Sequence, residues 1–430
     1  MNRSILFSLV MLAIPYNLQP AVMHSGDIPS VRALIAGESY DEALSIIYSM
    51  QKTDYNDKDL WYLGGIAHNR MMRQDSALYY LTRAQGLDST DRQIAGALAS
   101  VYASLRQSAR AREIYAEMIR QDSTLLMPYI QMAAIHMRDN EPRAALEIYL
   151  QLHAMEPGNP GFVKSIADCY RRSGNELQAV RYYRRAHSMN NSDLSINLAL
   201  ASLFARMKDF QGGLDIAEAG LSVDGSHAEL LFWSGFFNYA LGRYSSAIIR
   251  LNQAEENGNE SIMVYQYLGI SHYLMKNYEK ARDYLEQVIT ANVNDHRLYT
   301  YLGRIYMQLK DYEISEIYFL NALEVLKPDT KSIIDTYLNL VDSYRLEGSW
   351  EKMADAYNSA MHHDGNNPYL HYGLAYTFDN HLDRHDDALE FYSMFIEIVS
   401  AFADPGNELL SLMDYAQARV KRIREEQFFQ

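Results

Sequence analysis

The sequence predicts an all-α fold in which helix hairpins repeat along nearly the whole chain, and three observations lead to this prediction. Windows of 34 residues, starting at 24, 58, 92, 126, 160, 194, 228, 262 and 296, carry small residues at two fixed positions. Each window contains two stretches of about 14 residues in which apolar side chains recur with the i, i+3, i+4 spacing of a helix. Turn-forming pairs such as Asp122-Ser123 and Asp224-Gly225 separate the windows.

The eighth and twentieth residues of each window carry the repeat. Seventeen of the eighteen residues at these positions are Gly, Ala or Ser, and Val31 is the exception. Ordinary composition would supply about a quarter of them. Two helices of a hairpin approach closely only where small residues meet, so we expect bulky residues to fill the flanking space. The twenty-fourth residue is accordingly large in most windows, as at Leu81, Tyr115, Leu285 and Phe319.

Residues 1–25 differ from the rest of the chain. Arg3 is the only charge before Asp27, Ile5 to Ile14 form an apolar block, and prolines follow the block. This order predicts a secretory signal peptide that is cleaved near Ala21 or Ser25. The block is too short to span a bilayer, and no cysteine follows it to carry a lipoprotein anchor. The alternative is an unprocessed start of a cytoplasmic protein.

The repeat array is expected to cover residues 26–400. After a four-residue insertion around Lys327–Lys331, further windows start at 334 and 368, which brings the total to about eleven hairpins. Residues 401–430 are expected to contain a capping helix. Its apolar side chains, such as Leu409 and Ile423, would cover the last hairpin, while its charged side chains would face water.

These residues resemble the tetratricopeptide repeat family. Trp61 to Gly65 with Ala77, Tyr265-Leu268-Gly269 with Ala281, and Tyr299-Leu302-Gly303-Tyr306 with Ala322 carry the family pattern. The resemblance implies a right-handed superhelical solenoid whose concave face, lined by the first helix of each repeat, binds a protein or a peptide. Val341 and Met353 depart from the pattern, because they are large residues at the small positions.

Composition and charge exclude several classes of function. The 430 residues are 48% hydrophobic and 22% charged, with a formal net charge of −15. An acidic chain without a basic run is a poor candidate for binding nucleic acid. The single cysteine, Cys169, cannot form an intramolecular disulfide. The sequence has no run of about 18 apolar residues, so it predicts no transmembrane span. It also has no nucleotide-binding loop, nucleophile elbow or zinc-protease motif that would indicate an enzyme.

The family resemblance implies that positions 2, 5, 9 and 12 of each repeat face the groove. In the central repeats these positions include aromatic and polar residues that suit a peptide ligand. The resulting candidate partner-binding residues are Tyr62, Phe232, Phe236, Tyr239, Gln266, Tyr273, Arg304, Tyr372 and Tyr376. The alternative is that the rings belong to the core between the helices.

A second candidate surface is a polar patch in the window at 160, formed by Lys164, Asp168, Arg171 and Arg172, with Arg138 and Arg206 at matching places in the windows on either side. Arginine forks suit carboxylates or phosphates of a ligand. The alternative is a solvated face with internal ion pairs. The carboxylate clamp with which some family members hold chaperone tails is disfavoured, because Asp168 stands where the clamp needs Asn.

The sequence therefore predicts an exported, non-catalytic scaffold, periplasmic or associated with the cell envelope, that binds a protein or peptide. We expect no cofactor and no metal, although His381 and His385 leave a zinc or copper site as an alternative. Two other functions stay open. One is a carbohydrate-binding or structural envelope protein, and the other is a cytoplasmic regulatory adaptor.

Overall fold

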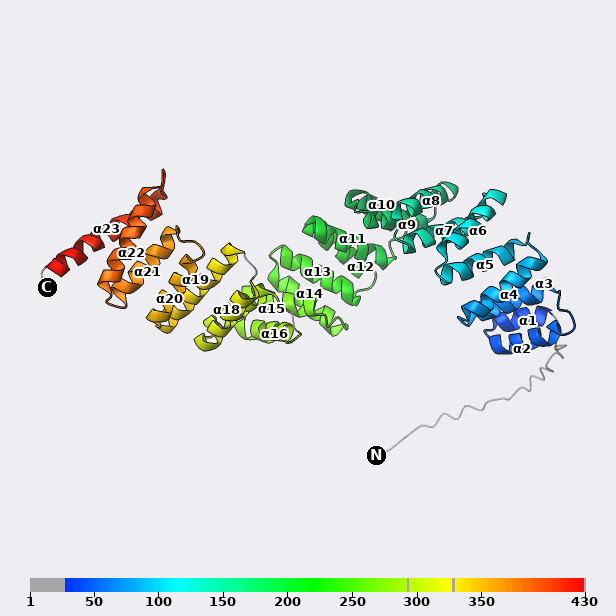
Figure 1. Cartoon of the computed structure of the whole chain (residues 1–430), viewed down its shortest axis with the longest axis horizontal. Helices are drawn as coiled ribbons and strands as arrows, with labels where there is room; N and C mark the ends of the chain where they lie inside the picture. Colours follow the sequence, from blue (N-terminus) through cyan, green and yellow to red (C-terminus); the bar gives the residue numbers. More distant parts are fainter. Residues whose placement is uncertain (1–27, 292–293, 327–328, 429–430) are drawn as a thin grey trace, which may run out of the picture. The chain divides into compact units, whose positions relative to one another are not determined.

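The computed structural model describes residues 28–291, 294–326 and 329–428 (Figure 1). The predicted signal peptide, residues 1–25, lies outside this range. All regular elements of the described residues are α-helices, so the predicted all-α solenoid is confirmed. None of these helices has the length and apolarity needed to cross a bilayer. The contacts divide the chain between Asn190 and Asn191 into two compact units, called unit 1 and unit 2 below.

Unit 1 consists of helix hairpins in which each odd-numbered helix packs against the even-numbered helix that follows it. The odd-numbered helix is called the first helix of its hairpin below. The described helices of unit 1 are α1 (Ile28–Ala36), α2 (Tyr40–Gln51), α3 (Lys58–Arg70), α4 (Gln74–Leu87), α5 (Arg92–Ser104), α6 (Ser108–Gln121), α7 (Leu126–Arg138), α8 (Pro142–Met155), α9 (Pro160–Arg172) and α10 (Glu176–Met189).

Unit 2 continues the same arrangement and ends with one unpaired helix. Its described helices are α11 (Leu194–Met207), α12 (Phe210–Leu221), α13 (Ala228–Ala240), α14 (Tyr244–Glu256), α15 (Ile262–Leu274), α16 (Tyr278–Thr290), α17 (His296–Gln308), α18 (Tyr312–Val325), α19 (Thr330–Glu347), α20 (Trp350–Met361), α21 (Pro368–Asn380), α22 (His385–Ser400) and α23 (Gly406–Phe428).

The sequence period sets where the helices begin. The windows from 58 to 296, and the window at 368, start at the first residue of a first helix. α19 is the main departure, because it begins at Thr330 rather than at 334 and is 18 residues long. The residues Thr330–Lys331 of the predicted insertion therefore belong to the helix.

Close packing inside each hairpin explains the small residues. A Cβ atom added to Gly303 in α17 would lie 2.6 Å from the ring of Phe319 in α18. A Cβ atom on Gly269 in α15 would lie 2.6 Å from the side chain of Leu285 in α16. The eighth residue thus faces the bulky twenty-fourth residue directly, as the packing argument predicts.

The turn inside each hairpin from α1–α2 to α19–α20 uses a left-handed residue at position 15 of the window, whereas the turn between α21 and α22 has it one residue later, at Asp383. This residue is Gly at Gly174, Gly242 and Gly348, but a residue with a side chain elsewhere, as at Met72, Lys276 and Lys310. In each case the next amide closes the turn; the Asn277 N–H, for example, donates to the His272 carbonyl at 2.9 Å. This is the Schellman arrangement, which satisfies a carbonyl left open at the helix end.

α23 covers the last hairpin of unit 2 and packs on α22. Leu409, Ala416 and Ile423 are buried in the same core cluster as Phe395 of α22. Arg419 of α23 donates from Nε and Nη2 to the two carboxylate oxygens of Asp379, at 2.7 and 2.5 Å. The Asp379 side chain is fully buried, so this bidentate ion pair ties α23 to α21.

Candidate functional site

Aromatic rings on the first helices of three successive hairpins in unit 2 form two contacting groups that share one buried cluster. We call this set the aromatic strip, and its members are Phe236, Tyr239, Tyr267, Tyr273 and Tyr301. The Tyr267 ring lies 5.2 Å from the Phe236 ring and 5.0 Å from the Tyr239 ring, measured between centroids. Tyr273 and Tyr301 are 5.2 Å apart, and both pack with Tyr239 against one buried cluster.

Burial raises the pKa values of three tyrosines of the strip. Loss of hydration raises the pKa of Tyr239 to about 12, and it also raises the pKa values of Tyr267 and Tyr301. All five rings are only partly buried. The strip therefore offers apolar area together with neutral hydroxyl groups, the combination that recurs at protein-binding hot spots.

Phe232 is a correction to the predicted site. It is 7% exposed and packs among Leu231, Leu251 and the Phe236 ring. The alternative stated above, that such rings belong to the core, holds for this residue. Phe232 packs in the core beneath Phe236, and almost none of its side chain is exposed to a ligand.

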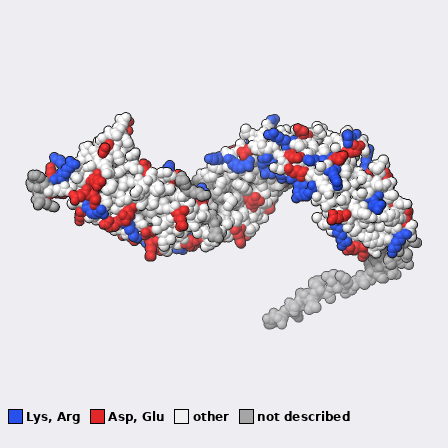
Figure 2. Space-filling model, in the orientation of Figure 1, with Lys and Arg blue, Asp and Glu red and all other residues white. Residues whose placement is uncertain are grey.

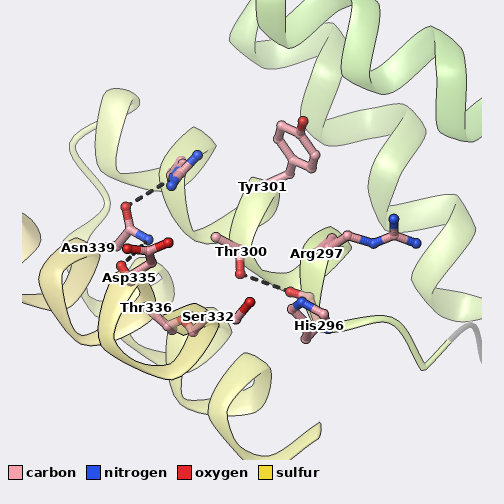
Figure 3. Close-up of a pocket in the computed structure, with 9 residues that line it drawn as sticks. His296, Arg297, Thr300, Tyr301, Ser332, Asp335, Thr336 and Asn339 are labelled. Carbon is pink, nitrogen blue, oxygen red and sulfur yellow. Dashed lines mark hydrogen bonds between the residues drawn. The ribbon is translucent and has the colours of Figure 1, made fainter. Parts of the chain in front are cut away.

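A polar pocket of about 210 Å³ adjoins the strip between α17 and α19 (Figure 3). We call it the Arg304 pocket, and it shares Tyr301 with the strip. The α17 residues that line it are His296, Arg297, Thr300, Tyr301 and Arg304, and the α19 residues are Ser332, Asp335, Thr336 and Asn339.

The two arginines of this pocket have different surroundings. Arg297 donates to both carboxylate oxygens of Asp295, with the shortest contact at 2.6 Å, and the pair raises the pKa of Arg297 above its ordinary value. In Figure 3, Arg297 points away from Asp335 and Asn339. Arg304 donates from Nε to Asn339 Oδ1 at 3.0 Å and has no acidic partner within 4.0 Å among the described residues.

The predicted polar patch in unit 1 is satisfied internally. Asp168 accepts from the Tyr183 hydroxyl at 2.5 Å and from Arg171 at 3.2 Å, while Arg171 Nε donates to the same hydroxyl. Lys164 lies on the same helix, α9, and is half-buried. Lys164, Asp168 and Arg171 thus lie on one helix, and the bonds of Asp168 and Arg171 hold α9 to α10.

Two neighbouring arginines of unit 1 have a repeated structural role. Arg172 donates to the Met137 carbonyl, and Arg138, one repeat earlier, donates to the Ala103 carbonyl, both at 2.8 Å. Each arginine therefore satisfies a carbonyl at the C-terminal end of the preceding first helix.

The predicted residues at the chain's two ends lie apart from the strip. Tyr62 lines a pocket of about 390 Å³ between α1 and α3, which Arg32 and Arg70 also line. In α21, Tyr372 packs against Phe395 and lies 6.2 Å from Tyr415 of α23, so the capping helix covers part of this ring. Tyr376, in contrast, is 38% exposed.

The histidines near the C-terminal end contact other side chains. His381 stacks on Trp350 with the ring centroids 3.7 Å apart, and His385 lies 3.4 Å from Asp379. No group of three or more metal-ligating side chains occurs among the residues that the structure describes.

Residues 268–329 match the family model described as tetratricopeptide repeat. This segment runs from α15 through α18, and the same hairpin contacts recur along both units. Residues 268–329 are a tetratricopeptide repeat segment. Arg304 and two of the five strip residues, Tyr273 and Tyr301, lie within the matched segment.

A curated relative of this chain is named Cellulose synthase operon protein C, from Pseudomonas fluorescens. The two are 27% identical over 169 residues, which is 37% of this chain and 13% of the relative. The match therefore spans a small part of the relative's length.

Solved repeat structures resemble the chain only loosely. The C-terminal part of a repeat protein from Cytophaga hutchinsonii is 18% identical, covers 57% of this chain and 98% of its own, and has a TM-score of 0.46. A repeat protein from Parabacteroides merdae is 17% identical, and the match covers 59% of this chain and 98% of that protein, with a TM-score of 0.41.

Two tyrosines of the aromatic strip were not predicted from the sequence. Tyr267 and Tyr301 stand at position 6, which was not among the four positions expected to face the groove. Trp233 at the same position of the preceding repeat makes three aromatic residues in a row, a signal that was visible in the sequence. Gln266, which was predicted, is half-buried beside Tyr267.

Charge is unevenly divided between the two units of the repeat array. Residues 28–190 hold 19 Lys and Arg against 18 Asp and Glu, whereas residues 191–430 hold 19 against 35. Figure 2 shows many acidic side chains over the C-terminal half of unit 2. The strip and the Arg304 pocket thus lie in the acidic unit.

Proposed function

We propose that this protein is a non-catalytic scaffold that binds an extended peptide segment of a protein partner along the first helices of unit 2. The observation that carries the proposal is the aromatic strip, whose rings lie on α13, α15 and α17 and which shares Tyr301 with the Arg304 pocket. First helices line the concave surface with which such arrays bind their ligands. Partly exposed rings give contact area at a low cost in side-chain entropy.

A selection from a random-peptide phage library tests the binding role. The parent protein should enrich peptides, and the triple variant Phe236→Ser/Tyr239→Ser/Tyr273→Ser should lose them. A matched control removes three exposed rings from unit 1, as Tyr48→Ser/Tyr55→Ser/Tyr79→Ser. Both variants must keep the parent's helical circular dichroism, so that loss of binding is separated from loss of folding.

Three outcomes decide the matter. Loss of binding in the strip variant alone supports the proposed surface. Equal binding by all three proteins shows that the strip is not the binding surface. If the folded parent enriches no peptide, the proposed function itself is wrong. If the parent does enrich peptides, affinity capture with crosslinking from the native envelope fraction would identify its natural partner.

We further propose that the protein is exported and works in the periplasm or on the cell envelope. The short apolar block at Ile5 to Ile14 with prolines after it supports this location. Sequencing the N-terminus of the protein from its native cells tests the proposal. A start near residues 22–26 is expected, while an intact Met1 would favour the cytoplasmic regulatory adaptor.

A carbohydrate-binding or structural envelope role is the second candidate. The similarity to a protein named for a cellulose synthase operon favours it, because the tyrosine rings of this chain could stack on sugar rings. Affinity electrophoresis in gels that contain soluble cellulose oligosaccharides tests it. Retardation of the parent but not of the strip variant would support glycan binding on the same surface.

A further inference from the structure

The guanidinium of Arg304 is held at one edge and left open at the other. Its Nε donates to Asn339 Oδ1 at 3.0 Å, and no described residue accepts a hydrogen bond from Nη1 or Nη2. The terminal N–H groups of a guanidinium form a planar fork that matches the two oxygens of a carboxylate. The Nη1 and Nη2 groups of Arg304, which form the edge that recognises a carboxylate, are thus free to bind a ligand in the pocket.

Asn339 fixes the direction of this fork. Its Nδ2 donates to the Asp335 carbonyl at 2.8 Å, one turn earlier in α19, while its Oδ1 accepts from Arg304. Both ends of the amide are engaged, so the side chain cannot rotate without losing a hydrogen bond. Little side-chain entropy therefore remains to be lost when a ligand binds to Arg304.

Other arginines named above are already committed to partners in the protein. Arg171 binds Asp168 and Tyr183, Arg297 binds Asp295, and Arg138 and Arg172 bind backbone carbonyls. Arg304 differs from Arg171 and Arg297 because its bond to Asn339 leaves its positive charge without a carboxylate, and it differs from Arg138 and Arg172 because it lines a pocket. Its place beside Tyr301, at the end of the aromatic strip, brings this charge to the proposed peptide site.

We propose that the Arg304 pocket binds the carboxylate of one Asp or Glu side chain of the peptide, next to an apolar residue that lies on the aromatic strip. This proposal rests on the proposed function. The pocket of about 210 Å³ is smaller than the roughly 300–1,000 Å³ of pockets for drug-sized ligands, so it suits a single side chain.

The acidic residues in and around the pocket favour a ligand group with one negative charge over a group with two. Asp335 also lines the pocket, and residues 191–430 carry 35 acidic against 19 basic residues. A phosphoryl group carries close to two negative charges at neutral pH, and it would be repelled more strongly than a carboxylate. Long acidic runs would be disfavoured for the same reason, so the expected ligand has one isolated carboxylate.

Selection from the random-peptide library with full-length variants tests this specificity. The parent should enrich peptides with Asp or Glu at a fixed spacing from an aromatic or apolar residue. Arg304→Glu should instead enrich Lys or Arg at that place. Arg243→Glu, which makes the same charge change at an exposed turn between α13 and α14, should keep the acidic preference.

Synthetic versions of one enriched peptide provide a second measurement on the unaltered protein. Replacing its acidic residue by Gln should weaken binding about ten- to a hundredfold, as expected for a charge-assisted hydrogen bond. Phosphoserine at that place should bind more weakly than Glu. With Arg304→Gln, the Glu and Gln peptides should bind alike, which isolates the pairing as in a double-mutant cycle.

The outcomes separate this inference from the proposed function. If the peptides need the strip but keep their acidic preference with Arg304→Glu, the carboxylate assignment is wrong and the binding role stands. If phosphoserine binds more tightly than Glu, the preference for a single charge is wrong. If no peptide depends on the strip, the failure lies with the proposed function.

Discussion

Single residues in the hairpin turns limit the stability of the array. Position 15 of the repeat is left-handed in every hairpin turn from Glu38 to Gly348. A residue with a Cβ atom in this conformation costs roughly 1–2 kcal/mol relative to a right-handed one. Glycine, which has no such penalty, occupies the position only at Gly174, Gly242 and Gly348.

Lys276→Gly is therefore expected to stabilise the protein by up to about 1 kcal/mol, because φ is 62° at this residue. The control Lys280→Gly lies inside α16, where glycine should destabilise by up to about 1 kcal/mol. Urea unfolding followed by circular dichroism measures both changes. A loss of stability in Lys276→Gly would contradict the argument from backbone conformation.

Buried histidines make the fold sensitive to acid. His272 is 5% exposed and stacks on Tyr284, and burial lowers its pKa below the ordinary 6.5. The unfolded chain then binds a proton at a higher pH than the folded chain does. The free energy of unfolding should consequently fall as the pH drops below about 6.5.

His272→Phe should flatten part of this pH dependence, since the neutral ring removes one of the titrating groups. Phe204 already occupies the same position in another repeat, which shows that the hairpin accommodates the ring. Melting temperatures of parent and variant between pH 5 and pH 7 provide the comparison. Parallel curves would mean that His272 does not contribute to the acid sensitivity.

At the scale of elements, most helices could be predicted from the sequence, whereas the start of α19 and several site residues could not. The windows located most first helices because small residues at position 8 must face bulky ones at position 24. α19 begins at Thr330 because the insertion continues the helix, and this extension brings Ser332 into the Arg304 pocket. Phe232 was expected in the groove, yet spacing alone does not show which rings a neighbouring helix covers.

The capping helix depends on its buried ion pair. Arg419→Met leaves Asp379 without its bidentate partner, with only contacts of 3.4 Å to Tyr392 and His385. A cost of about 3–5 kcal/mol is expected for an unpaired buried carboxylate. Arg422→Met, which removes an exposed pair with Glu426 from the same helix, should change stability by about 0.5 kcal/mol or less.

Amide hydrogen exchange of α21 to α23 measures where this loss falls. Exchange should accelerate in these three helices with Arg419→Met and remain close to the parent's with Arg422→Met. Adding Asp379→Asn to Arg419→Met should restore part of the protection, because no buried charge is then left unpaired. Failure of this double variant to recover would point to packing of the Arg419 stem instead.

At the scale of the whole molecule, the division into two units was not visible in the sequence, because the repeat period continues through Asn190 and Asn191. Repeat arrays derive their stability from each repeat and its neighbours. Two compact units with different charge are therefore expected to unfold at different denaturant concentrations. Such a chain would depart from two-state behaviour.

The three tryptophans allow this to be measured in the full chain. Trp61 lies in unit 1, and Trp233 and Trp350 lie in unit 2. Trp61→Phe leaves fluorescence from unit 2 only, and Trp233→Phe/Trp350→Phe leaves fluorescence from unit 1 only. Distinct urea midpoints are expected, and coincident midpoints in both variants and in the parent would show that the array unfolds as one cooperative body.

The left-handed turns also have a consequence for engineering. Glu38, Met72, Arg106, Lys208, Lys276 and Lys310 each lie in a different hairpin. Substitutions that share no partners usually contribute additively, so glycine at all six turns should combine several small gains. None of the six belongs to the aromatic strip or the Arg304 pocket. A heat-resistant form of the array could thus be built with its binding surface left untouched.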